Sequence, residues 1–80
     1  MRDYEALLKR ITLDPGVLVG KPCIRGMRIS VEQILDALAA GTLPQELLAE
    51  YPVLELDDIK AALLYAKELV PIERVFPVGR

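Results

Sequence analysis

The residues best suited to binding chemistry gather in one short basic segment, residues 20–29. It runs Gly-Lys-Pro-Cys-Ile-Arg-Gly-Met-Arg-Ile, so two glycines bracket Lys21 and Arg25, and Arg28 follows closely. Three cations on a compact turn can hold phosphate groups, and glycine lets a backbone approach a ligand closely. Lys21, Arg25 and Arg28 are therefore candidate DNA-binding residues. The alternative is an ordinary turn whose cations stay in water or pair with acids elsewhere in the chain.

Other reactive groups are scarce. The chain has no histidine and a single cysteine, Cys23, which excludes a His-based triad, a His/Cys metal cluster and an internal disulfide. Cys23 is interpreted as a small core residue. Two carboxylate pairs remain, Asp57 with Asp58 and Glu46 with Glu50, and we interpret both as solvated helix surface rather than as a site for a divalent ion. We therefore expect no enzymatic activity, no cofactor and no metal.

Charge is distributed unevenly along the chain. Residues 1–30 carry six basic and three acidic side chains, whereas residues 31–70 carry two basic and eight acidic ones, within a net charge of −2. Only the amino-terminal third has a basic field, so any contact with double-stranded DNA is expected there.

These residues must be positioned by a single small domain, because 80 residues leave no room for a second. We predict a mainly α fold in three parts. Residues 1–29 form a short helix, over residues 3–10, followed by small strands or a hairpin that includes a strand at residues 11–13. Residues 30–70 form a unit of three helices, and residues 71–80 form an extended tail.

Start and stop signals define the three helices of residues 30–70. Ser30 and Gln33 make a capping-box signature, and Gly41 ends the first helix. The second helix begins near residue 43 and stops before Pro52, and the third covers residues 56–70. The tight connection between the last two helices matches the outline of a helix-turn-helix unit.

The third predicted helix has an inward apolar stripe, and we expect that stripe to consist of Leu56, Ile59, Ala62, Leu63, Ala66, Leu69 and Val70. Leu64 and Tyr65 lie off this stripe, which makes them candidates for a partner or dimer interface. Three apolar residues of the tail are further candidates for that interface: Ile72, Val75 and Phe76. The two aspartates at the start of this helix argue against its insertion into a DNA groove.

Composition also bears on location and assembly. The longest apolar run, residues 61–66, is far too short for a membrane span, and residues 1–5 lack the layout of a signal peptide. We therefore expect a cytoplasmic protein that makes no membrane contact. The apolar share exceeds that of an ordinary soluble domain and favours a second buried surface, such as a homodimer interface.

The motifs together resemble a known family. Residues 10–16 (Arg-Ile-Thr-Leu-Asp-Pro-Gly), the string at residues 20–29, and the Asp-Asp-Ile-Lys-Ala-Ala-Leu-Leu-Tyr-Ala run at residues 57–66 look like the bacterial and archaeal domain of unknown function 433. Cys23 and Met27 occupy variable positions of the string. The resemblance implies a homodimer with a helix-turn-helix related core, similar to the antitoxin of a toxin–antitoxin pair. It also implies a PIN-type ribonuclease as the toxin and its own operator as DNA target.

Two hypotheses follow. The first is a non-enzymatic, antitoxin-like regulator that as a dimer binds a toxin and its own operator DNA. The alternative is a homodimeric protein–protein interaction module without DNA binding.

Overall fold

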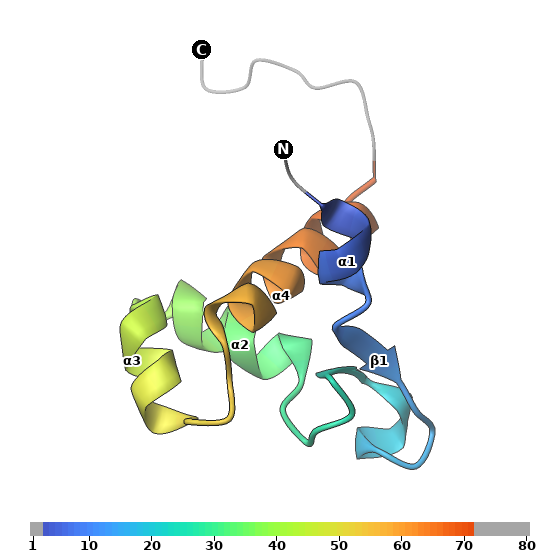
Figure 1. The fold of residues 1–80 in the computed structure, drawn as a ribbon, viewed down its shortest axis with the longest axis horizontal. Coiled ribbons are helices and arrows are strands. Elements are labelled where there is room, and N and C mark those ends of the chain that lie inside the picture. Colours follow the sequence, from blue (N-terminus) through green and yellow to red (C-terminus); the bar gives the residue numbers. More distant parts are fainter. Residues whose placement is uncertain (1–2, 72–80) are drawn as a thin grey trace.

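The computed structural model describes residues 3–71, which form four α-helices and a two-stranded antiparallel sheet. In chain order the elements are α1 (Tyr4–Leu8), β1 (Ile11–Leu13), the 3₁₀ turn η1 (Leu18–Gly20), β2 (Pro22–Ile24), α2 (Val31–Ala39), α3 (Pro44–Glu50) and α4 (Leu56–Leu69). In Figure 1, α4 crosses the molecule with α1 beside it, and the hairpin and α3 lie towards opposite sides. The prediction of a small β-rich segment followed by helices is confirmed, with four helices in the described part rather than a clear set of three. The predicted tail lies outside the described residues beyond Pro71.

The register of the hairpin fixes the position of two arginines. Ile11 pairs with Ile24 and Leu13 with Pro22. One step further along, the Arg25 N–H donates to the Arg10 carbonyl at 2.7 Å, so the two arginines face each other at the end of the hairpin. Like charges directly opposite each other on a sheet destabilise it unless an anion lies between them.

The turn that follows β2 contains one basic residue and one glycine of the predicted motif, Arg25 and Gly26. Arg25 and Gly26 both have positive φ, 45° and 74°, and the Met27 N–H donates to the Ile24 carbonyl at 2.8 Å. Positive φ at both central positions is the pattern of a type I′ turn, which glycine adopts freely and arginine adopts at a cost of about 1 kcal/mol. The segment is therefore a tight turn, as the glycine spacing predicts.

The ends of α2 agree with the sequence signals. Ser30 Oγ accepts from the Gln33 N–H and Gln33 Oε1 accepts from the Ser30 N–H, each at 3.0 Å, which completes the predicted capping box. At the other end, the Thr42 N–H reaches the Ala37 carbonyl at 2.9 Å past Gly41, whose φ is 99°. This is a Schellman motif, and only glycine takes that conformation without strain.

The core lies where α2, α3 and α4 meet under the hairpin, and its buried members are Ile24, Val31, Ile34, Leu47, Leu54, Ile59 and Ala62. Cys23 is also buried, which confirms its interpretation as a core residue. The longest described helix, α4, has 14 residues, and no helix of the described part has the length and apolar character needed to cross a membrane.

The rotation of α4 differs from the prediction. Leu64 is buried, with 8% of its surface exposed. Four residues of the expected inward stripe are instead exposed, by 49%, 49%, 66% and 63%: Leu56, Leu63, Leu69 and Val70. The physical reason is Asp58, which is completely buried and faces the two arginines of the hairpin. Leu63, five residues later, is turned about 140° away from Asp58 around the helix axis, and therefore faces solvent.

One strained residue gives a prediction. Val19 in η1 has φ 58° and ψ 36° and is 93% exposed. A left-handed conformation is costly for a β-branched residue, whereas asparagine tolerates it. We expect Val19→Asn to raise the free energy of unfolding by about 0.5–1 kcal/mol in urea denaturation. Val53→Asn is the matched control, because Val53 is also exposed but has no positive φ; an equal gain in both variants would contradict the strain argument.

Candidate functional site

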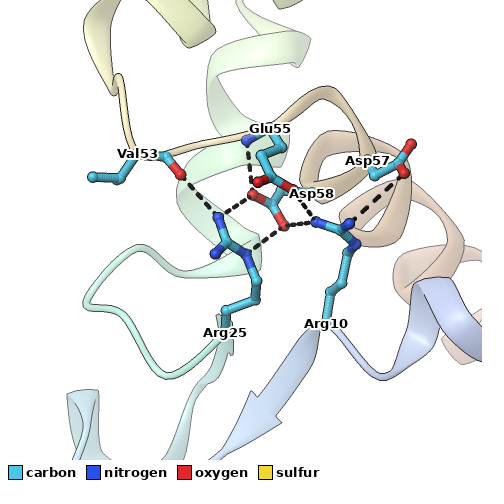
Figure 2. Close-up of polar contacts among 6 residues, drawn as sticks. All are labelled: Arg10, Arg25, Val53, Glu55, Asp57 and Asp58. Carbon is cyan, nitrogen blue, oxygen red and sulfur yellow. Dashed lines mark hydrogen bonds and ion pairs between the residues drawn. The ribbon is translucent and has the colours of Figure 1, made fainter.

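Asp58, which is completely buried, is the centre of an ion-pair cluster whose arginines are partly exposed, shown in Figure 2. Its Oδ1 accepts from Arg10 Nη1 and from Arg25 Nε, each at 3.0 Å. Its Oδ2 accepts from Arg25 Nη2 and from the Glu55 N–H, each at 2.8 Å. The carboxylate therefore lies between the two hairpin arginines and also caps the first turn of α4. We call Asp58, Arg10, Arg25 and the Glu55 N–H the Asp58 cluster.

The outer hydrogen bonds of the two guanidinium groups join further segments to the cluster. Arg10 Nη1 contacts Glu55 Oε1 at 2.7 Å, and Arg10 Nη2 lies 3.8 Å from Asp57 Oδ2. Arg25 Nη2 donates to the Val53 carbonyl at 2.8 Å. The hairpin, the connection before α4 and the start of α4 are thus joined by one set of charges, with the forked donors of Arg25 matching the carboxylate geometry.

The Asp58 cluster shifts the pKa values of its members. Burial by itself raises the pKa of Asp58, but hydrogen bonds from Arg25, the Glu55 N–H and Arg10 outweigh it, so the pKa lies below the ordinary value of 3.8. The pKa of Arg25 is raised mainly by its hydrogen bond to Asp58. The pKa of Arg10 is raised mainly by its hydrogen bonds to Glu55 and Asp58. The cluster therefore holds all three side chains in their charged forms.

The lowered pKa of Asp58 predicts acid sensitivity. A carboxyl whose pKa is depressed by folding stabilises the folded state above its unfolded pKa, and this stabilisation is lost as the pH falls through the lower, folded value. In an NMR titration of the full chain we expect the Asp58 carboxyl carbon to change shift with a midpoint below 3.8. Unfolding is expected to accompany or follow that protonation. A midpoint above 3.8 would contradict the arrangement.

The three candidate DNA-binding residues have different environments. Lys21 Nζ pairs with Glu32 at 2.9 Å on the surface, and this hydrogen bond raises the pKa of Lys21. Arg25 belongs to the Asp58 cluster. Arg28 is exposed and makes no ion pair within residues 3–71. The structure does not bring the three cations together on one phosphate-binding surface, and two of them already have acidic partners.

The interpretation of both carboxylate pairs as solvated helix surface is wrong for Asp58, which is completely buried and pairs with Arg10 and Arg25. Asp57 is half exposed beside Arg10. Glu46 Oε1 accepts from the Leu43 N–H at 2.7 Å and so caps α3. Within residues 3–71 no group of three potential ligands is placed to hold a metal ion.

A groove with a volume of about 670 Å³ lies between α1 and α4. This is within the range of small-ligand and peptide-binding pockets. Both helices supply apolar side chains to its walls. The charged lining is balanced, with two acids and two bases, and the principal lining residues are Tyr4, Leu7, Leu63, Leu64, Asp3, Asp57, Arg10 and Lys60. We call this the α1–α4 groove.

The outward face of α4 continues the groove. Leu56, Leu63 and Val70 repeat every seven residues along that face and are 49%, 49% and 63% exposed. Lys60 and Lys67 lie between them at four-residue offsets and are exposed as well. The Lys67 ammonium is 6.0 Å from the centre of the Tyr4 ring, so it also bridges α4 to α1. The result is an exposed apolar stripe flanked by two lysines, of which Lys67 also pairs with Glu68 at 3.1 Å.

The predicted interface residues are distributed differently from the expectation. Leu64 is buried at the floor of the groove rather than outward, and Tyr65 is half buried against the core. Ile72, Val75 and Phe76 lie outside the described residues. Leu63 and the Asp58 cluster were missed. A sequence signal for the cluster exists, since an acid at the third position of a helix is a common capping residue, but its arginine partners lie 33 and 48 residues away.

This geometry defines a small helical domain whose β-hairpin is joined to the longest described helix by ion pairs to a buried aspartate. The chain belongs to the family described as Protein of unknown function (DUF433), whose sequence profile matches residues 11–66. A solved DUF433 member from Anabaena variabilis is 35% identical and superimposes with a TM-score of 0.73, over 81% of this chain and 64% of that one.

A curated relative, the uncharacterized protein y4eO of Sinorhizobium fredii, is 32% identical over 65 residues. The match covers 81% of this chain but 29% of that protein, so the chain spans less than a third of its relative. The family span contains Arg25, Asp58 and most of α4. It leaves out α1, which forms the other wall of the groove, and residues 72–80.

Proposed function

We propose that the chain is a non-enzymatic, antitoxin-like regulator that binds a partner protein through the α1–α4 groove and the outward face of α4. The observation that carries the proposal is the unpartnered apolar stripe, in which Leu56, Leu63 and Val70 stay about half or more exposed beside a groove of about 670 Å³. Exposed apolar surface of this regularity is typical of protein contacts.

The charges of this surface indicate the chemistry of the partner. Lys60 is exposed and has no ion pair within residues 3–71, whereas Lys67, two turns further along, pairs with Glu68 at 3.1 Å. A segment with apolar anchors and flanking acids therefore fits the surface. By the family resemblance, the partner would be a PIN-type ribonuclease toxin in the cytoplasm, with the regulator acting as a homodimer.

Binding of operator DNA is the weaker part of the hypothesis. A helix-turn-helix role for α3 and α4 would place the start of α4 near DNA, where Asp57 opposes phosphate and Asp58 is already paired. Lys21 and Arg25 are engaged in ion pairs, which leaves Arg28 as the candidate most available for phosphate. The arrangement thus favours the alternative of a protein-interaction module without DNA binding.

Co-expression tests the proposal. The full chain is produced with the protein encoded beside it in its genome, and the purified product is analysed by size exclusion with light scattering. We expect a stable complex with the wild type and its loss with Leu63→Glu. Leu13→Glu is the control, because Leu13 is 63% exposed on the hairpin and does not line the groove. A complex that survives Leu63→Glu, or no complex at all, would contradict the proposal.

A further inference from the structure

Strand β1 has one open edge. Within residues 3–71 it pairs only with β2, in a two-stranded sheet. The Arg25 N–H donates to the Arg10 carbonyl, and bonded positions alternate along an antiparallel pair, so the backbone groups of Ile11 and Leu13 point away from β2. No other backbone group of the described residues hydrogen-bonds to them. An open strand edge of this kind is a template for another strand.

The backbone of this edge suits a second copy of the same strand. We propose that two chains pair through β1, antiparallel and centred on Thr12, so that their hairpins form one four-stranded sheet. In this register Ile11 lies opposite Leu13 of the second copy, and the backbone groups that point away from β2 hydrogen-bond to each other. A sheet of two strands is marginal by itself, and a larger sheet with an apolar face is more stable.

The apolar side chains of the edge fit the same register. Ile11 packs against the core, whereas Leu13, two positions along and therefore on the same face of the strand, is 63% exposed. The pairing places Ile11 of the second copy beside Leu13. It thus covers an apolar side chain that the single chain leaves in water.

Charge complementarity supports an antiparallel second copy. Lys9 and Arg10 precede the strand and Asp14 follows it, so antiparallel pairing brings the basic end of each strand to the acidic end of the other. Arg10 remains in the Asp58 cluster. Lys9 and Asp14 are both exposed and have no ion pair within residues 3–71, so they are available to each other across the two copies.

This surface is separate from the α1–α4 groove. None of residues 11–14 lines the groove, so a chain can hold a second copy at β1 and a partner protein at the groove at the same time. The inference therefore stands or falls independently of the partner proposed above. In the co-expression experiment, Leu13→Glu is expected to separate the two copies, because it puts a carboxylate on the edge, and to leave the partner bound.

The pairing is tested on the full chain alone by NMR. In an equal mixture of isotope-labelled and unlabelled chains, we expect a nuclear Overhauser effect between Thr12 Hα of one chain and Thr12 Hα of the other. These protons face each other across a non-hydrogen-bonded pair. The Ile11 and Leu13 amides are expected to be protected from hydrogen exchange, and more strongly as the chain concentration rises, because they find acceptors in the dimer.

Leu13→Pro removes one outward N–H of the edge. Proline is accepted at edge positions whose N–H faces away from the sheet, so we expect the circular dichroism spectrum to stay the same and the dimer to be lost in sedimentation velocity. Leu13→Val is the matched control, because it keeps both the N–H and an apolar side chain, and it is expected to pair like the wild type. If Leu13→Pro does not fold, the NMR measurements on the wild type decide.

Any of three results would overturn the proposal. The first is a wild type that sediments as single chains at millimolar concentration and shows no effect between chains. The second is exchange of the Ile11 and Leu13 amides at the rate of an unprotected peptide. The third is a dimer that survives Leu13→Pro, which would show that the copies meet through another surface.

Discussion

Replacing Asp58 by alanine is expected to cost about 3–5 kcal/mol of the free energy of unfolding. The substitution removes four hydrogen bonds at once and takes away the carboxylate between Arg10 and Arg25, so that only Arg10 keeps an acidic partner, Glu55. It also removes the side chain that caps α4, a loss of about 1 kcal/mol that is part of the same total. The total stability expected for a domain of this size is about 4–12 kcal/mol, so the loss is a large share of it. Urea denaturation monitored by circular dichroism measures it.

Asp57→Ala is the matched control for Asp58→Ala. Asp57 is the neighbouring aspartate, is about half exposed, and lies 3.8 Å from Arg10 at its shortest contact. Exposed pairs of this kind contribute about 0–1 kcal/mol. Similar losses in the two variants would show that burial and pairing of Asp58 do not stabilise the fold as described.

Arg25→Glu is expected to destabilise the domain clearly, because it replaces the cation that pairs with Asp58 by a second carboxylate. The new carboxylate would face the completely buried Asp58, and the hydrogen bond to the Val53 carbonyl would be lost as well. Loss of DNA retention in this variant, alone or with Arg28→Glu, would then report unfolding rather than a broken phosphate contact. Thermal unfolding by circular dichroism, measured before any binding assay, distinguishes the two.

Arg28→Glu is the control for Arg25→Glu, because it reverses the same kind of charge without removing an ion pair within residues 3–71. Arg28 is exposed and has no ion pair within residues 3–71, so its substitution is expected to change stability by less than about 0.5 kcal/mol. If Arg25→Glu were as stable as Arg28→Glu and had lost DNA binding, Arg25 would be a DNA contact and its role in the Asp58 cluster would be wrong.

Features that depend on neighbouring residues were predictable from the sequence. Ser30, Gln33 and Gly41 specify both ends of α2 through contacts within a few positions, and the structure has those contacts. The strand at residues 11–13 was also predicted from neighbouring residues alone, and the structure has it. Each of these signals is a backbone conformation or cap that a short stretch of chain determines by itself.

Features that depend on distant residues were not predictable. The pairing of Arg25 with Asp58 spans 33 positions, and it sets the rotation of α4 by placing a carboxylate on the inward face. Hydrophobic periodicity assumes that apolar residues face inward, so it placed Leu63 in the core and Leu64 outside. The α1–α4 groove follows from that rotation, and for this reason the candidate site was located only in part.

The central claim is that this chain acts by binding a protein through the α1–α4 groove. Mapping of amide chemical shifts on the full chain, as the product of the neighbouring gene is added, tests it most directly. We predict that the largest changes fall on α1 and on the outward positions of α4, at Leu7, Lys60 and Leu63, while residues 20–29 stay unchanged. Chemical-shift changes confined to residues 20–29, with α1 and α4 unaffected, would contradict the claim. They would show that the partner binds the basic segment instead.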